Sequence, residues 1–303
     1  MSERILVTGG AGFIGSFVCE ELLKTGKEVV ALDDLSVGKR EYVPKGAEFA
    51  EGSIMDKILL DKLVSSCDKI YHLAVVALPI SLKNPVAAHD VNATGTVNLL
   101  EAARKYGKGF VYVSSSEVYG NAKEENMKET HQLEPRTPYA ASKLAGEVYA
   151  LSYCRTFGLP VVVVRPFNSF GPHHREDSYS CVVTRFIKNV QQNKPIVIFG
   201  DGEQSRDYTY VKDTARGIVI CGENAKLGDV VNIGYGKDIT INEIARIIKS
   251  SIGVEAKITY ANERPGDVRR LCADTSKARK LGFEPAYSFS TGLEEYLEWL
   301  KRY

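Results

Sequence analysis

The sequence predicts an α/β protein in which a doubly wound parallel sheet is followed by a smaller α/β lobe. Short runs of β-branched residues alternate with longer amphipathic stretches over the first 165 residues. Residues 161–164 are all valine, which is typical of a strand buried on both faces of a sheet. After Arg165, loops rich in Gly, His and Asp interrupt this alternation, so we expect a different architecture there.

The N-terminal part contains its expected elements in a regular order. In the stretch before Gly107, Val91, Val97 and Leu100 recur at helical spacing. Strands that alternate with such helices imply βαβ units, and βαβ units build a parallel sheet. We expect strands at residues 5–8, 28–32, 69–73, 110–114 and 161–165, and helices at residues 14–25, 91–106 and 139–157.

The C-terminal part has longer loops between its elements. This pattern indicates a smaller lobe, with a segment that crosses back to the sheet. We expect loops at residues 171–179, 200–207 and 263–268, a strand at 230–234, a helix at 242–252 and an amphipathic segment at 292–303.

The composition argues against several classes of protein. The chain has 39 Lys and Arg residues and 38 Asp and Glu residues, so no overall field would attract nucleic acid or an anionic membrane. We expect no signal peptide and no membrane span, because the apolar runs are too short. The six cysteines show no metal-ligand spacing, which predicts reduced thiols in a cytoplasmic protein and no metal site.

A glycine-rich turn lies between the first expected strand and the first expected helix. Gly9, Gly12 and Gly15 stand in Thr8-Gly9-Gly10-Ala11-Gly12-Phe13-Ile14-Gly15. Such a turn lets the backbone approach a pyrophosphate, which then lies at the positive end of the helix. Glycines also serve ordinary turns, so the surrounding sequence decides between the two interpretations.

The second expected strand supports the dinucleotide interpretation. It leads into Asp33 and Asp34, and Asp33 lies 18 residues beyond Gly15. A carboxylate at this place can accept hydrogen bonds from both ribose hydroxyls of NAD, and it would repel the 2′-phosphate of NADP. We therefore predict a Rossmann-type sheet that binds NAD.

A tyrosine and a lysine define the candidate catalytic face. Tyr139 and Lys143 are four residues apart and share one face of the expected helix. A free tyrosine has a pKa of about 10, and a nearby ammonium and the positive nicotinamide would favour its tyrosinate. Ser114, Ser115 and Ser116 end the preceding strand, where a hydroxyl could hydrogen-bond the reacting oxygen. A solvated helix face and a serine-rich loop are the plainer alternatives.

Several motifs occur together and in a fixed order along nearly the whole chain. They are the Gly9–Gly15 turn, Asp33-Asp34-Leu35, His72-Leu73-Ala74, Asn92, Ser114–Gly120, Tyr139–Lys143, Arg165-Pro166-Phe167-Asn168, Gly200-Asp201-Gly202, Arg206-Asp207 and Arg264-Pro265-Gly266-Asp267-Val268. With these motifs the chain resembles the extended short-chain dehydrogenases/reductases of the NAD-dependent nucleotide-sugar epimerase/dehydratase group.

The resemblance implies a role for each matching position. It implies a catalytic set of Ser115, Tyr139 and Lys143, with Glu117 beside it. It implies NAD contacts at Gly9, Gly12, Phe13, Ile14, Gly15, Asp33, Asp34, Ser53, Ile54, Leu73, Ala74, Asn92, Tyr139 and Lys143. It implies contacts to a nucleoside-diphosphate sugar at Ser81, Ser115, Ser116, Asn168, Arg206, Arg264 and Asp267. Arginine forks suit phosphate oxygens, which agrees with the last group.

Two stretches depart from the family pattern or are unusual. The family often has Asp where Ser53 stands, which affects an adenine contact, and often Ala where Val75 stands. Residues 75–81 are apolar and should line the nicotinamide side of the pocket. His173 and His174 lie in an expected loop with Arg175, Glu176 and Asp177, and we interpret this loop as substrate-binding or plain surface.

The resemblance leaves the reaction open. A 4-epimerase oxidises the sugar at C4 and returns the hydride to the other face. A 4,6-dehydratase also removes the C5 proton, and relatives of that kind share Ser115-Ser116-Glu117, as do some sugar-acid decarboxylases. Ser116 stands where many dehydratases have Asp. We favour a 4-epimerase of a UDP-hexose, with the dehydratase and the UDP-glucuronate decarboxylase as alternatives. A sensor that binds NAD without catalysis is a further alternative.

The domain organisation follows from these assignments. We expect residues 1–168 to form the NAD-binding domain, with a return segment around residues 208–250. Residues 169–303 should mainly form the nucleotide-sugar-binding lobe. Relatives often pair through two long helices, and residues 91–106 and 139–157 could supply them in a homodimer.

Overall fold

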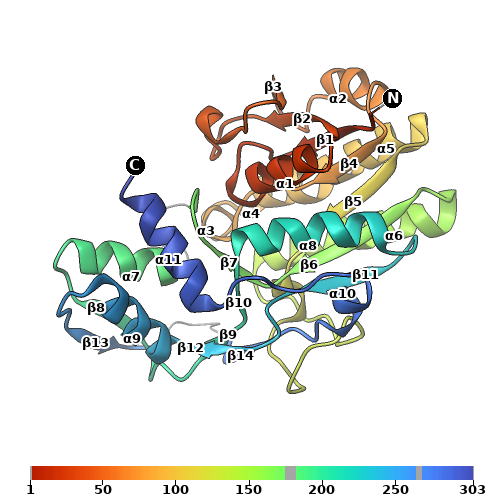
Figure 1. Ribbon diagram of the computed structural model, residues 1–303. Helices are drawn as coiled ribbons and strands as arrows, with labels where there is room; N and C mark the ends of the chain where they lie inside the picture. Colours follow the sequence, from red (N-terminus) through yellow and green to blue (C-terminus); the bar gives the residue numbers. More distant parts are fainter. Residues whose placement is uncertain (1, 175–181, 264–267, 303) are drawn as a thin grey trace.

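The protein is built on a seven-stranded parallel sheet, seen in a computed structural model that describes residues 2–174, 182–263 and 268–302 (Figure 1). The strand order is β3-β2-β1-β4-β5-β6-β11, which is a doubly wound Rossmann-type order and confirms the predicted fold class. The strands are β1 (Arg4–Thr8), β2 (Glu28–Asp33), β3 (Glu48–Glu51), β4 (Lys69–His72), β5 (Gly109–Val113), β6 (Val161–Pro166) and β11 (Val230–Ile233).

The apolar strands are explained by burial on both faces. Along β1, Ile5 and Val7 point into one core cluster, whereas Leu6 points into the other. This follows from the two-residue period of a strand, which sends successive side chains to opposite faces. The valine run in β6 is divided between the two clusters in the same way.

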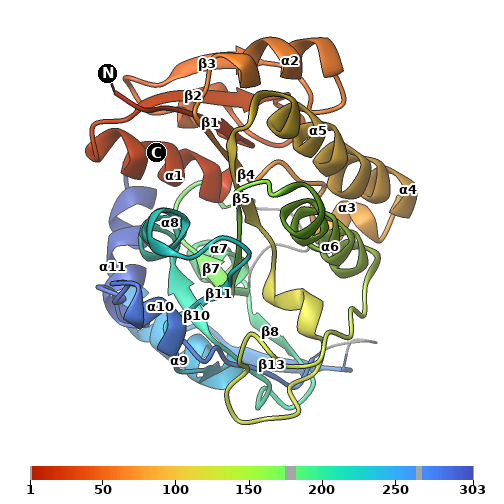
Figure 2. The same cartoon turned by 90° about the vertical axis from the view of Figure 1, so that its right-hand side faces the viewer.

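Helices cover both faces of the sheet, as Figure 2 shows in an end-on view. One face carries α1 (Phe13–Lys24) and α8 (Val211–Asn224), and the other carries α2 (Lys57–Ser65), α5 (Thr96–Tyr106) and α6 (Pro138–Phe157). Among the described residues, no helix combines the length and the apolar character that a membrane crossing requires.

The helix expected over residues 91–106 is divided in the structure. It consists of α4 (Pro85–His89), a π-helical segment η2 (Asp90–Gly95) and α5. A π-helical turn carries an extra residue, and such turns often occur near functional sites. Here the turn contains Asn92, whose side chain points inward to the loop after β4.

Residues 230–234, expected as a strand, belong to the large sheet. β11 lies parallel to β6, with Val231 beside Val164. The preceding helix α8 was not expected from the sequence. It packs against α1, so residues 211–233 return from the lobe and complete the sheet.

Most of the remaining elements form a smaller α/β lobe below the sheet in Figure 1. Its helix α7 was also missed, although Val183, Phe186, Ile187 and Val190 show helical spacing. The helices are α7 (Val182–Gln191), α9 (Ile241–Ile252), α10 (Ser276–Lys280) and α11 (Phe289–Leu300). The strands are β7 (Asn168–Phe170), β8 (Ile196–Phe199), β9 (Ser205–Arg206), β10 (Tyr208–Tyr210), β12 (Ile239–Thr240), β13 (Ile258–Ala261) and β14 (Arg270–Leu271).

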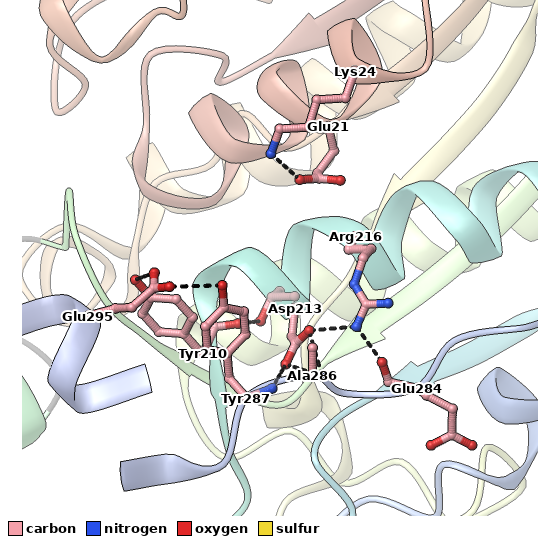
Figure 3. A network of polar contacts seen from close by, with 10 residues as sticks. Glu21, Lys24, Tyr210, Asp213, Arg216, Glu284, Ala286, Tyr287 and Glu295 are labelled. Carbon is pink, nitrogen blue, oxygen red and sulfur yellow. Dashed lines mark hydrogen bonds and ion pairs between the residues drawn. The ribbon is translucent and has the colours of Figure 1, made fainter. Parts of the chain in front are cut away.

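Polar contacts fasten the C-terminal segment to α8 (Figure 3). The buried carboxylate of Asp213 accepts hydrogen bonds from the backbone N–H groups of Ala286 and Tyr287, at 2.9 and 2.8 Å. Arg216 donates to the same carboxylate at 2.7 Å and also to the carbonyl oxygen of Glu284. These contacts hold the chain that leads into α11 against the helix that covers the sheet.

Candidate active site

A cavity of about 450 Å³ opens at the carboxyl edge of the large sheet. Because the strands are parallel, the residues after β1, β2, β4, β5 and β6 meet at this edge and line the cavity. The expected site residues that line it are Gly9, Gly12, Phe13, Ile14, Gly15, Asp33, Asp34, Ser53, Ile54, Leu73, Ala74, Ser115, Ser116, Glu117, Tyr139, Lys143 and Asn168.

The glycine-rich turn brings the start of α1 to the cavity wall. Gly9 has a φ of +71°, a left-handed conformation that favours glycine. A Cβ atom at Gly15 would lie only 2.0 Å from the carbonyl oxygen of Gly9, so no other residue fits there without a shift. The first turn of α1 carries no acidic residue. The exposed N–H groups of this helix end therefore suit the pyrophosphate of NAD.

The two aspartates after β2 have different surroundings. Asp33 is 8% exposed, and its carboxylate accepts hydrogen bonds from the N–H groups of Ala11, at 3.0 Å, and Leu35, at 2.9 Å. Burial raises the pKa of Asp33, and these two hydrogen bonds lower it. Asp34 is exposed, and its carboxylate accepts hydrogen bonds from Ser36. Asp33 is thus the carboxylate that the fold fixes at the cavity wall, where the ribose hydroxyls of NAD would fit.

Two expected contact residues lie behind the cavity lining. Asn92 is buried, accepts a hydrogen bond from the N–H of Val76 at 2.7 Å, and donates to Ser142 at 2.9 Å. Ser81 is also buried, in the short helix α3 (Leu78–Ser81), and its hydroxyl donates to the carbonyl oxygen of Leu78. Both side chains therefore hold the loop after β4, while Val76 and Leu78 themselves line the cavity.

Tyr139 lies at the start of α6 and lines the cavity together with Ser115, which is near enough to act on the pKa of the phenol through hydrogen bonding. Burial raises the pKa of Tyr139 to about 12, the hydrogen bond with Ser115 lowers it, and the charge of Glu117 raises it. The sequence suggested that Lys143 would favour the tyrosinate. In the structure burial is the largest influence on this pKa, so the tyrosinate that proton transfer needs would depend on the positive charges of Lys143 and of bound NAD. Ser115 itself caps the 3₁₀ helix η3 (Ser116–Tyr119) by accepting from the N–H of Glu117.

Lys143 lies one helical turn after Tyr139 and is 2% exposed. Its ammonium lies 4.3 Å from the centre of the Tyr112 ring. Burial lowers the pKa of Lys143 to about 7, and the charge of Glu147 raises it. Near neutral pH this lysine is therefore close to its midpoint, and small changes in its surroundings alter its charge.

The residues expected to hold the diphosphate are spread over the lobe. Asn168 begins β7, and its buried Oδ1 has no hydrogen-bond partner among the described residues, so a ligand could satisfy it. Arg206 is half-buried in β9 and donates to the carbonyl oxygen of Ser205 at 2.8 Å. It is not among the residues that line the cavity. Arg264 and Asp267 lie outside the described residues.

The paired histidines line the cavity beside α1. The ring of His173 stacks on Tyr42 with 3.8 Å between centroids, and its Nδ1 lies 2.9 Å from Oγ of Ser16. His174 makes an edge contact with Phe13. Burial lowers the pKa of His173 to about 4, so its ring is neutral near pH 7. The sequence did not indicate that the rings of His173 and His174 lie on the cofactor side of the cavity. Arg175, Glu176 and Asp177, expected in the same loop, lie outside the described residues.

The parallel sheet, the glycine turn and the Ser115–Tyr139–Lys143 group define an NAD-dependent enzyme of the short-chain dehydrogenase/reductase type. Comparison with known proteins agrees. The model of the NAD dependent epimerase/dehydratase family matches residues 5–234. The chain belongs to this family, and its cofactor is NAD.

The relatives include more than one activity. The chain is 36% identical over 301 residues to a putative UDP-glucose 4-epimerase of Methanocaldococcus jannaschii, covering 98% of each chain. It is 35% identical over 314 residues to a dTDP-glucose 4,6-dehydratase of Streptomyces niveus, covering 98% of this chain and 93% of the relative. The crystal structure of a UDP-glucose 4-epimerase from Thermotoga maritima, with UDP-glucose, matches with a TM-score of 0.94 at 35% identity, covering 99% of each chain.

Proposed function

We propose that the protein is a nucleotide-sugar 4-epimerase that acts on a UDP-hexose through a transient 4-keto sugar. The observation that carries this proposal is that Ser115, Tyr139 and Lys143 line one cavity together with the glycine turn. Similarity to epimerases with UDP-sugar names supports the substrate class.

In this proposal each residue of the group has one task. Ser115 donates a hydrogen bond to the 4-oxygen of the sugar, and Tyr139 accepts the proton of the 4-hydroxyl. Tyr139 would enter this step as the phenolate, which the positive charges of Lys143 and of the bound nicotinamide favour, and it becomes neutral when it takes the proton. When bound, NAD supplies the hydride acceptor for C4 and the donor for its return. After the keto sugar has rotated and its other face has received the hydride, Tyr139 gives the proton back to the 4-oxygen.

The nucleotide part of the substrate would bind along the lobe. We assign the diphosphate to Asn168, Arg206 and Arg264, and further sugar or ribose contacts to Ser116 and Asp267; Ser81, expected as a contact, is buried behind the cavity lining and is left out. The orphaned Oδ1 of Asn168 supports the first of these assignments. Residues 1–168, together with the return segment around 208–250, would form the NAD-binding domain, and the rest of residues 169–303 the substrate lobe.

A second reaction has one specific observation in its favour. Glu117 lines the same cavity, and its charge acts on Tyr139. A carboxylate there could remove the C5 proton that a 4-keto group acidifies, as a 4,6-dehydratase requires. In the decarboxylation of a 4-keto uronate the C5–C6 bond breaks instead, and the same group could help to return a proton to C5. Dehydratases and UDP-glucuronic acid decarboxylases are both among the relatives.

Product mass and isotope content separate the reactions. The protein is incubated with UDP-glucose, UDP-GlcNAc, UDP-glucuronate, dTDP-glucose and GDP-mannose in D₂O. We expect a new stereoisomer with no deuterium at C5. Loss of water with deuterium at C5 would establish the dehydratase instead, and loss of CO₂ the decarboxylase. In the epimerase, Glu117→Gln should keep turnover within a few-fold of wild type; in an elimination it should cost about 10²-fold.

We also propose a cytoplasmic homodimer that pairs through α5 and α6. The outer side of α6 presents Val148 and Tyr149, which are 57% and 48% exposed. Exposed apolar side chains in a row are typical of an interface. Light scattering should give twice the chain mass, and Val148→Glu should shift the protein towards the monomer.

A further inference from the structure

A buried ion pair lies directly beneath the candidate catalytic group. Glu147 of α6 and Arg165 of β6 are 1% and 3% exposed in their side chains. Nε of Arg165 donates to Oε2 of Glu147 at 3.1 Å, and Nη2 donates to Oε1. A buried pair of this kind is often no more stable than apolar residues of the same size, so its presence calls for another explanation.

The pair is the centre of a larger hydrogen-bond network. Oγ of Ser114 donates to Oε2 of Glu147 at 2.7 Å. Nη1 of Arg165 donates to the hydroxyl of Tyr119 at 2.7 Å, and this hydroxyl donates to Asn232 at 2.7 Å. The network therefore joins the carboxyl ends of β5 and β6 to α6, η3 and β11. A buried network whose groups have partners is rigid and fixes the relative places of these elements.

The network reaches the reacting groups through adjacent residues. Ser114 immediately precedes Ser115, and Glu147 lies one helical turn after Lys143 and two turns after Tyr139. The hydrogen bond from Ser114 to Glu147 thus ties the strand end that carries Ser115 to the helix that carries Tyr139. Any slip between β5 and α6 would change the distance between the two hydroxyls.

Glu147 is also the acid whose charge acts on Lys143. The other groups around Lys143 come from several elements: Tyr139 on α6, Tyr112 on β5, His72 on β4, and, on the far side of Glu147, Arg165 on β6. Burial keeps His72 neutral by lowering its pKa well below the usual range. Glu117 faces the group from η3, next to Tyr139. Removal of the charge of Glu147 would leave Lys143 without the acid that opposes the effect of burial on its pKa.

We propose that Glu147 is a positioning residue for the proposed reaction: through Ser114 it holds Ser115 against Tyr139, and by its charge it favours the ammonium form of Lys143. This inference rests on the proposed function, because it assigns Glu147 a task in the chemistry of Tyr139 and Lys143. Glu147 itself does not line the cavity.

The first test compares three variants by their pH–rate profiles. In Glu147→Gln we expect kcat to fall about tenfold, because the alignment is disturbed. We also expect the alkaline limb of the profile to move about one unit lower, because Lys143 loses its proton more easily. Ser114→Ala should lower kcat without moving the limb, since the charge stays. Glu147→Asp should keep the limb near that of wild type.

The second test needs no substrate. The melting temperature is measured for wild type, Glu147→Gln, Lys143→Met and the double variant, at about pH 6 and about pH 9. Glu147→Gln should lower Tm more at the acidic pH, where Lys143 is charged, and this pH dependence should vanish in the Lys143→Met background.

The outcomes separate the two proposals. A folded Glu147→Gln protein with an unmoved alkaline limb and kcat within twofold of wild type would overturn the role of Glu147. So would a loss of Tm that is the same at both pH values, because that would be a purely structural effect. If wild type converts no nucleotide sugar, the proposed function fails, while the melting temperatures still decide whether Glu147 acts on Lys143.

Discussion

The cofactor side of the cavity and its sugar side are built in different ways. The cofactor side comes from contiguous segments at strand ends, and backbone groups and glycines form much of it: the turn at Gly9–Gly15 and the N–H groups that fix Asp33. The sugar side depends on single side chains from separate segments, such as Asn168 and Arg206. Backbone geometry can be fixed by a short motif, whereas separate side chains are brought together only by the fold.

The largest expected effect lies where the two sides meet. Tyr139→Phe should lower hydride transfer by about 10²–10⁴-fold while binding of the nucleotide sugar remains nearly intact, because the phenol is asked only to move a proton. Single-turnover formation of NADH measures hydride transfer, and calorimetry measures binding of the nucleotide sugar. Tyr260→Phe, in the lobe and 59% exposed, is the matched control. Retention of more than about a tenth of the rate in Tyr139→Phe would remove Tyr139 from the role of base.

On the cofactor side, Asp33→Ala should weaken NAD binding by about tenfold or more, since hydrogen bonds to a charged group are lost. Discrimination against NADP should relax in the same variant. Asp34→Ala, at the neighbouring exposed carboxylate, should change both dissociation constants less. Calorimetry measures the dissociation constants of NAD and of NADP for both variants. Equal effects of the two variants would contradict the assignment of the ribose to Asp33.

On the sugar side, Arg206→Ala should weaken UDP binding by about fivefold, and the loss should shrink at high salt. Arg269→Ala is the control, because Arg269 lies in the same lobe but forms an exposed ion pair with Asp201. Titration of UDP at low and high ionic strength measures both. If Arg206→Ala binds UDP as wild type does, the diphosphate lies elsewhere and the proposed sugar side is wrong.

The last prediction concerns stability rather than a rate or a binding constant. The pKa of Lys143 is about 7 in the folded protein and about 10.4 in an unfolded chain, so between these values the unfolded state binds more protons. The free energy of unfolding of wild type, relative to Lys143→Met, should therefore rise as pH increases through this window. Below about pH 7 the difference should be constant. Urea unfolding of both proteins across the range gives the slope, and a difference that falls with pH would show that Lys143 is not buried as a weakened base.

Much of the fold was predictable because its signals are local. The strands at 5–8, 28–32 and 161–165 were expected to within one residue at their ends. Helices α7 and α8 were not predicted, although α7 has a clear helical period. The loop-rich sequence around them was interpreted as irregular structure. The π-helical turn at Asp90–Gly95 could not be expected, since it depends on how Asn92 bonds the loop after β4.

The sequence by itself determined the order of βαβ units, the glycine turn, the acidic end of β2 and the shared helix face of Tyr139 and Lys143, because each is a pattern of neighbouring residues. Only the tertiary structure decided the burial that shifts the pKa of Tyr139 and of Lys143, the place of His173 against Tyr42, and the pairing of Glu147 with Arg165. These depend on burial and on contacts between residues far apart in the chain, and a pKa in particular responds to the loss of water around a group, which no local pattern records.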